Sequence, residues 1–237
     1  MGKIVLLAMT LAFLNVTAQK TVSASDIMDD IKKGKDISYK NVTIDGIVDF
    51  TYMDEALEKL PEKRKRSWWG NNNYSNKAEK LIDVKLSFEN CIFKEDVLAY
   101  IPDEDSGYTF IASFEKEAIF KNCKFEGKAM FKYSTFEKNS DFSGSEFQED
   151  STFKYAKFNN KVSFANSVFE DSAVFKYTNF NNGVSFENTN FKEDLNIKYM
   201  KVNGEFNISK MKVAYSIDSK YTKINGQGFN KYILDRD

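Results

Sequence analysis

The sequence predicts an all-β solenoid in which the chain turns four times to close each coil. Fourteen phenylalanines stand at spacings that alternate between five and six residues, which marks an internal repeat. Alternate half-repeats differ, because one reads Phe-Lys-Tyr and the other reads Phe-x-Asn followed by a small residue, so the full unit has 22 residues. The series comprises Phe120, Phe125, Phe131, Phe136, Phe142, Phe147, Phe153, Phe158, Phe164, Phe169, Phe175, Phe180, Phe186 and Phe191.

This spacing excludes both a helix and a straight strand. Residues five apart on an α-helix are separated by about 140° around the axis, so the phenylalanines would form no single seam. In a straight strand a step of five moves a side chain to the opposite face. The chain must therefore turn between successive phenylalanines, and four turns bring each residue above its equivalent in the preceding repeat. Four columns of phenylalanine are expected to fill the axis.

A small or slim side chain stands two positions before each of the fourteen phenylalanines. These side chains are Ala118, Cys123, Ala129, Ser134, Ser140, Ser145, Ser151, Ala156, Val162, Ser167, Ala173, Thr178, Val184 and Thr189. The pattern resembles the pentapeptide-repeat family, whose unit has a small residue, a polar residue, a central Leu or Phe and two variable residues. Over 118–191 this resemblance implies a right-handed quadrilateral β-helix with the central and small residues pointing inward. The sixth residue in every second unit departs from the family pattern and predicts rounded corners.

The chain is expected to consist of four parts. They are a signal peptide at 1–18, an N-terminal cap helix at 19–36, a β-helix at 37–225 with excursions at about 53–80 and 96–113, and a C-terminal cap at 226–237.

The segment 1–18 has the organisation of a secretory signal peptide. A short positive region ending at Lys3 precedes an apolar run from Ile4 to Leu14, which is too short for a comfortable membrane span. Small residues before Gln19 offer a cleavage site, and an uncleaved anchor is the alternative. We therefore expect a periplasmic or extracellular protein whose mature chain has no transmembrane span.

Both ends of the solenoid need protection, because a terminal coil exposes an unpaired backbone edge and an open core. Ser23 can cap a short helix that carries Ile27 and Ile31 one turn apart and stops before Gly34. Beyond Phe191, the last phenylalanine of the series, apolar residues continue the inward frame. They are Ile197, Val202, Ile208, Val213 and Ile224. After them, a cluster suited to closing the last coil comprises Phe229, Tyr232, Ile233 and Leu234.

The first excursion contains the candidate binding residues, which combine positive charge with both tryptophans of the chain. They are Arg64, Lys65, Arg66, Trp68 and Trp69. Basic groups attract acidic groups and aromatic rings stack on sugars or bases, so this segment can hold an anionic polymer or rest on an anionic membrane. The alternative is that the tryptophans pack against the β-helix while the basic side chains stay solvated.

The second excursion, from Asp96 to Ser113, breaks the phenylalanine register. Its acidic stretch at 102–107 favours a surface loop. Calcium binding is an alternative there, although the spacing of an EF-hand is absent.

The outward residues of the repeats form columns with different chemistry. The lysine column comprises Lys132, Lys154, Lys176, Lys198 and Lys220. Like charges about 5 Å apart repel, and we expect the neighbouring acidic edge, which includes Glu170 and Asp171, to relieve that repulsion. The tyrosines that follow these lysines are expected to form a stacked ladder, with an exposed aromatic stripe for sugars as the alternative. Stacked asparagines suit the corners, because they tolerate a left-handed backbone.

Composition argues against catalysis. The chain has no histidine and two cysteines, so it lacks the commonest general base and a plausible zinc site, and we expect no catalytic residue, metal or cofactor. Cys91 and Cys123 occupy equivalent inward positions, as small core residues or, in an oxidising compartment, as a disulfide.

The predicted function is an exported non-catalytic scaffold or binding protein of the bacterial cell envelope, with an envelope protein or polysaccharide as partner. A DNA mimic, known among pentapeptide-repeat proteins, is disfavoured by the export signal and by the balance of 34 basic against 35 acidic residues, so no nucleic acid is expected. A glycan-acting β-helix enzyme is the other alternative, although the sequence places no carboxylate pair at an identifiable cleft.

Overall fold

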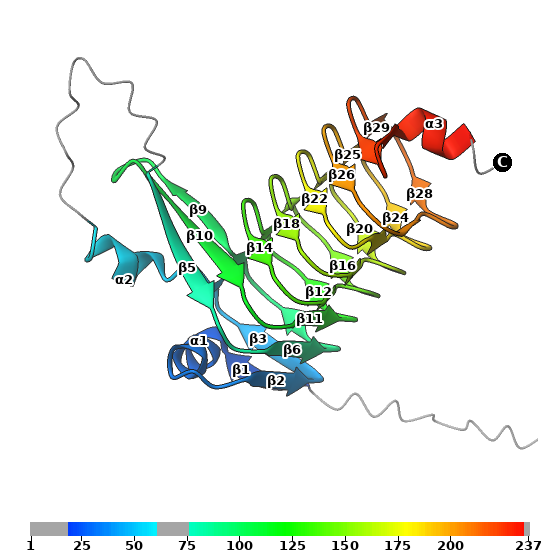
Figure 1. Ribbon diagram of the computed structural model, residues 1–237. Coiled ribbons are helices and arrows are strands. Elements are labelled where there is room, and N and C mark those ends of the chain that lie inside the picture. Colours follow the sequence, from blue (N-terminus) through cyan, green and yellow to red (C-terminus); the bar gives the residue numbers. More distant parts are fainter. Residues whose placement is uncertain (1–18, 61–75, 235–237) are drawn as a thin grey trace, which may run out of the picture.

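The computed structural model describes residues 19–60 and 76–234, and these form a right-handed, four-sided β-helix (Figure 1). Between residues 118 and 224, each strand pairs in parallel with its equivalent in the next repeat, as in Phe125 with Phe147 and Phe158 with Phe180. The predicted length of the coil is therefore confirmed. We number the four faces in the order in which one coil visits them.

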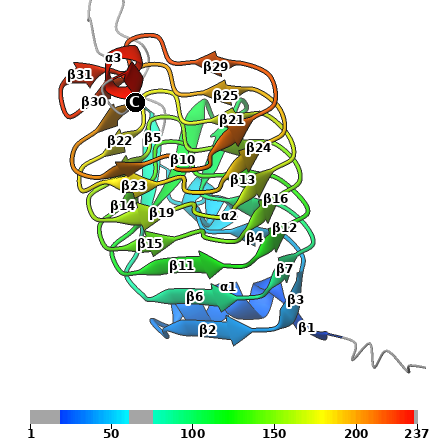
Figure 2. The same ribbon diagram turned by 90° about the vertical axis from the view of Figure 1, so that its right-hand side faces the viewer.

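Each face is a stack of short parallel strands. Face 1 comprises β2 (Ile37–Lys40), β6 (Leu86–Glu89), β11 (Ala118–Lys121), β15 (Ser140–Asp141), β19 (Val162–Ser163), β23 (Val184–Ser185) and β27 (Phe206–Asn207). Face 2 comprises β1 (Lys20–Ser23), β3 (Val42–Asp45), β7 (Ile92–Phe93), β12 (Lys124–Phe125), β16 (Glu146–Phe147), β20 (Val168–Phe169), β24 (Asn190–Phe191) and β28 (Lys212–Val213). Figure 2 shows these two stacks along the length of the molecule.

The other two faces complete the coil. Face 3 comprises β4 (Val48–Asp49), β8 (Val97–Leu98), β13 (Ala129–Met130), β17 (Ser151–Thr152), β21 (Ala173–Val174), β25 (Leu195–Asn196) and β29 (Ile217–Asp218). Face 4 comprises β5 (Lys77–Ile82), β10 (Tyr108–Phe114), β14 (Thr135–Phe136), β18 (Lys157–Phe158), β22 (Asn179–Phe180), β26 (Lys201–Val202) and β30 (Lys223–Ile224), with β9 (Tyr100–Asp103) and β31 (Gln227–Gly228) added antiparallel.

The axis is filled by the phenylalanine columns that the spacing predicts. All fourteen of these side chains are exposed by 2% or less, and the fourteen small residues that precede them are buried as well. Within a column the rings stack face to face, for example Phe147 on Phe169 with centroids 4.5 Å apart and an interplanar angle of 7°. Rings of neighbouring columns meet edge to face, as Phe153 and Phe164 do at 5.1 Å and 78°. The core is therefore a continuous aromatic stack with no polar side chain larger than serine or threonine.

The two kinds of unit make two kinds of corner. The five-residue unit from Phe131 to Phe136 turns sharply, because the amide of Ser134 donates to the carbonyl of Phe131 and Tyr133 adopts a left-handed backbone with φ of 66°. The six-residue unit from Phe136 to Phe142 turns through a bend at Lys138 instead. The extra residue therefore lies in a bend, at the corners where rounding was predicted.

The inward hydroxyls explain why Ser and Thr recur at the small positions. The Oγ of Ser145 donates to the carbonyl of Phe120 at 2.6 Å, and the Oγ of Ser167 donates to that of Phe142 at 2.8 Å. Thr178 and Thr189 repeat this bond to the carbonyls of Phe153 and Phe164. Each hydroxyl therefore ties one coil to the preceding coil inside the core.

Ser134 is the exception among the buried side-chain oxygens of the described residues, because its Oγ has no hydrogen-bond partner. The carbonyl in the preceding coil that is equivalent to the acceptors of Ser145 and Thr178 belongs to Ala99. This carbonyl already accepts from the amide of Ala112. The second excursion, to which Ala112 belongs, thus leaves Ser134 with a buried, unsatisfied hydroxyl.

We expect Ser134→Ala to leave stability unchanged or to raise the free energy of unfolding by about 1 kcal/mol, because it removes an unsatisfied polar group. The matched variant Ser145→Ala should lower it by about 1–3 kcal/mol, since it breaks the bond to Phe120 and strips the amide of Cys123 of its acceptor. Urea unfolding of both variants measures the difference. A larger loss for Ser134→Ala than for Ser145→Ala would contradict the assignment.

The N-terminal end is closed by α1 (Ala24–Lys32), which lies across the first coil (Figure 2). Ser23 caps this helix by accepting from the amide of Ser25, and Ile27 and Ile31 are buried against the core as expected. The sheet nevertheless begins before the helix, because β1 pairs in register with β3, Lys20 lying opposite Val42. The predicted start of the coils at residue 37 is therefore one strand too late.

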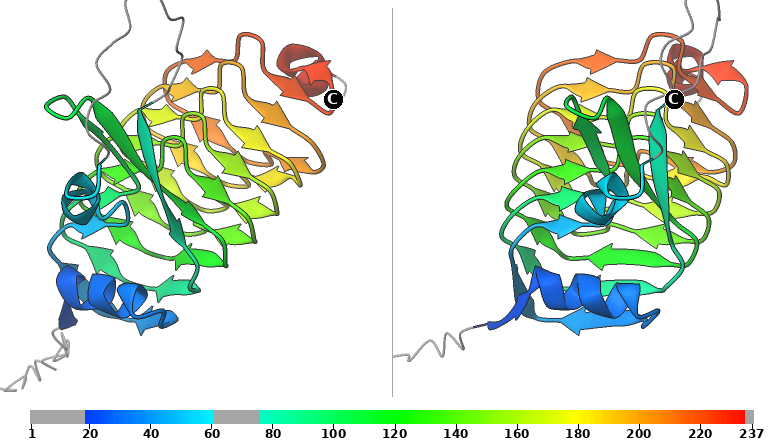
Figure 3. Two further views of the ribbon diagram at one scale, coloured as in Figure 1. Left: turned by 60° about the vertical axis from the view of Figure 1, so that its left-hand side comes forward. Right: turned by 90° about the vertical axis from the view of Figure 1, so that its left-hand side faces the viewer.

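The excursions extend the solenoid sideways. The first begins with α2 (Met53–Leu57), which lies on the flank of the β-helix next to β5 (Figure 3). The second was expected as a surface loop at 96–113, but it starts with the regular strand β8 and continues as the hairpin of β9 and β10. The hairpin forms because β10 gains β5 as a parallel partner on its other edge.

The C-terminal end is covered in part by α3 (Phe229–Leu234). The chain reverses at Asn225 and Gly226, both left-handed, so that β31 pairs back on β30. Phe229 is buried beside Phe206, and the hydroxyl of Tyr232 donates to the Phe206 carbonyl at 2.8 Å. Phe229 and Tyr232 of the predicted closing cluster therefore contact the last coil, whereas the side chains of Ile233 and Leu234 lie outside the described part of the chain.

Candidate functional site

The most regular polar feature of the described surface is the corner between faces 3 and 4, which we call the Lys-Tyr corner. It comprises the pairs Lys132 and Tyr133, Lys154 and Tyr155, Lys176 and Tyr177, Lys198 and Tyr199, and Lys220 and Tyr221. The five tyrosines form a ladder with successive ring centroids 4.9, 4.7, 4.6 and 4.8 Å apart. The first three of these ring pairs are within 7° of parallel. The stacked arrangement predicted for this column is thus present.

The ladder carries a backbone strain in every coil, whereas the opposite corner carries it mainly on asparagine and glycine. All five tyrosines have positive φ values, between 59° and 66°. The corner between faces 1 and 2 needs the same conformation and uses Asn122, Gly144, Asn166 and Asn188, which adopt it more readily, with Lys210 as the exception. A left-handed aromatic residue costs about 1–2 kcal/mol, and ring stacking offsets it by about 0.5–1.5 kcal/mol per pair. Turn geometry alone therefore does not explain why tyrosine stands here.

The lysines of this corner are not neutralised by carboxylates. None of the five Nζ atoms lies within 4.0 Å of an acidic oxygen among the described residues. Partial burial, followed by the charges of Lys132 and Lys176, lowers the pKa of Lys154 below the usual value for lysine. The expectation that the acidic edge relieves this column is therefore wrong.

The acidic edge lies at the corner between faces 2 and 3, and its carboxylates find other partners. Glu170 pairs with Lys192 at 2.7 Å, and Asp194 accepts from the amide and the hydroxyl of Ser216. Face 3 separates this edge from the Lys-Tyr corner, so the surface carries opposite charges on two adjacent corners.

The lysines instead lie beside the tyrosine rings. The Nζ of Lys154 is 5.4 Å from the centroid of Tyr155, and that of Lys220 is 5.1 Å from that of Tyr221. Burial, then the neighbouring Tyr199 and Tyr155, raises the pKa of Tyr177, so its hydroxyl stays protonated and can donate. The corner thus offers a row of ammonium groups beside a row of phenolic hydroxyls.

The hairpin marks the N-terminal end of the ladder. The Nζ of Lys132 donates to the hydroxyl of Tyr100 on β9 at 2.9 Å. The Nζ of Lys77 on β5 lies 3.8 Å from the ring centroid of Tyr133. The stretch of the corner beyond the hairpin therefore begins at Lys154 and continues to Tyr221, which is 58% exposed.

A family model described as pentapeptide repeats (9 copies) matches residues 112–157 and 153–200 of the chain. These residues are pentapeptide repeats. The matched stretch is the most regular part of the β-helix and includes the corner from Tyr133 to Tyr199. Neither the curated proteins nor the solved structures contain a match to this chain.

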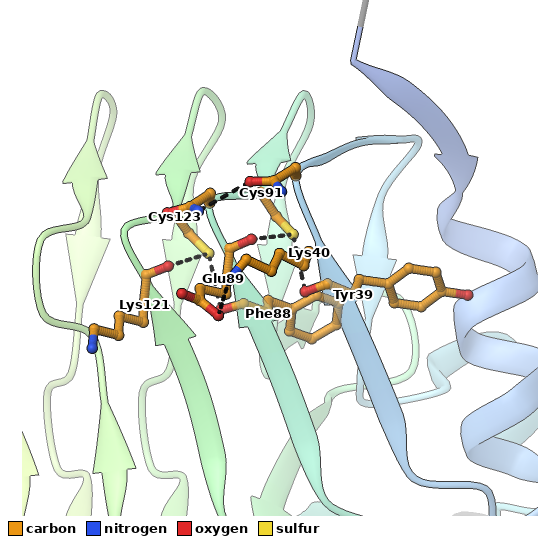
Figure 4. A network of polar contacts seen from close by, with 9 residues as sticks. Tyr39, Lys40, Phe88, Glu89, Cys91, Lys121 and Cys123 are labelled. Atoms are coloured by element: carbon orange, nitrogen blue, oxygen red, sulfur yellow. Dashed lines mark hydrogen bonds and ion pairs between the residues drawn. The ribbon is translucent and has the colours of Figure 1, made fainter.

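The two cysteines belong to the inward column of face 2, which continues with Ser145 and Ser167 in the following coils. Figure 4 shows them on neighbouring coils with free, buried thiols. The Sγ of Cys91 donates to the carbonyl of Tyr39 at 3.5 Å, and that of Cys123 donates to the carbonyl of Phe88 at 3.4 Å. The side-chain interaction with Cys123 lowers the pKa of Cys91, and the same interaction together with burial raises the pKa of Cys123. Both thiols thus serve as small core residues here.

The stacked asparagines of the repeats bond mainly to one another. The Nδ2 of Asn181 donates to the Oδ1 of Asn159 at 2.7 Å, and Asn188 donates likewise to Asn166 at 2.9 Å. Of these four, Asn166 and Asn188 are left-handed, whereas Asn159 and Asn181 are not, so the left-handed backbone expected at the stacked asparagines after the Lys-Tyr units is absent there. At the corner between faces 4 and 1, the left-handed residues are Gly183 and Gly204 instead.

The binding residues predicted in the first excursion, Arg64, Lys65, Arg66, Trp68 and Trp69, lie outside the described residues, and their role stays a prediction. In the acidic loop, Asp103 accepts from the amide of Ser106 at 3.0 Å. Within residues 19–60 and 76–234, no three carboxylate or thiol side chains gather as a metal site would require. The Lys-Tyr corner was noted in the sequence as two columns, but its unpaired charge became visible only in the fold.

Proposed function

We propose that this protein is an exported, non-catalytic scaffold of the bacterial cell envelope that binds a partner along the outside of its repeats. The observation that supports this most is the difference between the inward and the outward positions of each coil. The inward positions hold phenylalanine and small residues, all buried, while the charged side chains stand in regular columns outside. Ligand groups are therefore offered by the outer surface, over the length of several coils.

Export rests on the segment 1–18, which carries a positive start, an apolar run and small residues before Gln19. No helix in the described part of the chain is long and apolar enough to cross a membrane. An envelope protein or a polysaccharide is the partner that this location favours.

The two other functions have less support. A DNA mimic needs a strongly acidic surface, whereas this chain is balanced at a net charge of −1 and presents an unpaired row of lysines. A glycan-acting enzyme needs two carboxylates on either side of the glycosidic bond that it cleaves. At the acidic edge, Glu170 instead pairs with Lys192, and Asp194 accepts from Ser216.

We expect the native chain, expressed in a bacterium, to appear in the periplasm or the medium with Gln19 as its first residue. N-terminal sequencing of each cell fraction measures this. Leu7→Arg should keep the protein in the cytoplasm with the segment 1–18 still attached, because a charge interrupts the apolar run. Lys20→Gln is the control, since it lies beyond the cleavage site. Uncleaved native protein in the cytoplasm would refute export.

A further inference from the structure

The Lys-Tyr corner repeats its charge at a fixed interval along the solenoid. The tyrosine rings, which mark the rise of each coil, are 4.6–4.9 Å apart over five coils. One lysine accompanies each ring, so ammonium groups recur along the corner once in each coil. A ligand that matches this row must also be linear and must repeat its negative charge.

A second set of lysines flanks the ladder on its other side. Face 4 begins two residues after each tyrosine, and its outward positions include the exposed Lys157, Lys201 and Lys223. Lys201 and Lys223 are direct neighbours in the sheet, and none of the three pairs with a described carboxylate. The tyrosine ladder therefore runs between the lysine column and a face 4 column in which lysine alternates with Thr135 and Asn179 before Lys201 and Lys223. Such an array is stabilised by an anionic ligand that displaces its counterions.

We propose that the Lys-Tyr corner binds an extended acidic polysaccharide that lies along the solenoid axis, with one anionic sugar facing each coil. The ammonium groups pair with the carboxylate or sulfate groups of successive sugars. The tyrosine hydroxyls, whose rings present their edges to the outside, donate to sugar oxygens. This inference deepens the proposed function, on which it depends only for the envelope as the source of the polymer.

The geometry of the rings favours a polysaccharide over a nucleic acid. Binding of single strands relies on bases stacking on free aromatic faces. Here the faces of Tyr155, Tyr177 and Tyr199 are covered by the rings above and below them, so only their edges and hydroxyls are offered. In a duplex the phosphates of one strand rise by about 3.4 Å, which does not match the coil spacing. A chain with one acidic group per sugar carries its charges at a more similar interval.

Polygalacturonate, which has a carboxylate on every sugar, is the probe. The full chain should bind it in low salt by calorimetry and should not bind neutral pullulan. Affinity should rise with the length of defined oligogalacturonates up to about five sugars, one for each of the five lysines, and then level off. A single-stranded oligothymidylate serves as the nucleic-acid arm.

The decisive variant is Lys154→Gln, Lys176→Gln and Lys198→Gln together. We expect it to weaken binding of polygalacturonate by about a hundredfold, because each lysine near an anionic surface contributes roughly fivefold. The slope of log affinity against log salt should fall in magnitude by about 2–3. The matched control is Lys124→Gln, Lys192→Gln and Lys212→Gln, which removes the same charge from face 2 and its edge and should change affinity by less than about threefold.

Thermal unfolding separates loss of binding from loss of folding. Since burial and its lysine neighbours disfavour the charge on Lys154, the triple variant should keep or raise the melting temperature of the free protein. Equal losses in both triple variants, or none in the first, would overturn the proposal. Tighter binding of oligothymidylate, lost in the same variant, would reassign the corner to nucleic acid. Because binding is measured on purified protein, these outcomes do not depend on whether the cell exports it.

Discussion

Phe153→Ala is expected to lower the free energy of unfolding by about 3–5 kcal/mol, because it opens a cavity in the middle of the aromatic stack. The side chain is fully buried and lies between the parallel rings of Phe131 and Phe175 at 5.3 and 5.0 Å. It also meets Phe142 and Phe164 edge to face, at 5.5 and 5.1 Å. These rings belong to the same rigid ladder of coils, so they cannot collapse into the space.

Urea unfolding followed by circular dichroism measures this loss. Phe153→Leu is the matched control, since the family unit accepts a central leucine, and it should cost less than half as much. Tyr215→Ala removes an aromatic side chain that is 72% exposed and should change stability by no more than about 0.5 kcal/mol. If Phe153→Ala lost less than about 1 kcal/mol, this ring would not be part of the axis.

Gly183→Ala is expected to lower the free energy of unfolding by about 2–4 kcal/mol, because it combines backbone strain with overpacking. Gly183 has a φ of +87°, and a Cβ there would lie 2.7 Å from the carbonyl oxygen of Glu205 in the next coil. That oxygen accepts from the amide of Val184, so it cannot move aside without breaking a ladder hydrogen bond. The coils would have to separate at this corner.

Gly226→Ala is the control for the strain alone. Gly226 has a similar φ of +82°, and a Cβ there would meet no atom within 4 Å. It should cost about 1–2 kcal/mol, so the difference between the two variants measures the close approach of the coils. Equal losses would show that neighbouring coils tolerate a methyl group at Gly183.

The repeat and its core could be predicted from the sequence because each coil uses the same inward positions. Each repeat contains a phenylalanine and a small residue two positions before it, at a constant period. Stacking of the coils places these residues in columns, so the pattern can be recognised within one short segment. The end cap was predicted for the same reason, since Ser23 and the pair Ile27 and Ile31 are a local helix pattern.

The errors occur where distant segments meet. The stretch 96–113 looks like an acidic loop, but β10 becomes a strand because β5, from an earlier part of the chain, lies along its edge. The start of the sheet was placed too late because β1 pairs with β3, which follows α1 in the sequence. The lysine column was assigned acidic partners that stand on the next corner, beyond the width of face 3.

The sequence by itself determined the coil, the aromatic axis and the chemistry of each outward column, since these depend on a short repeat and on which residues turn or stack. The tertiary structure alone decided which columns are neighbours across a corner. It left Lys154 beside two other lysines rather than a carboxylate, and Ser134 without an acceptor. Both results depend on the distance between segments from different coils, and a charge or a hydroxyl is satisfied only by a partner within a few ångströms.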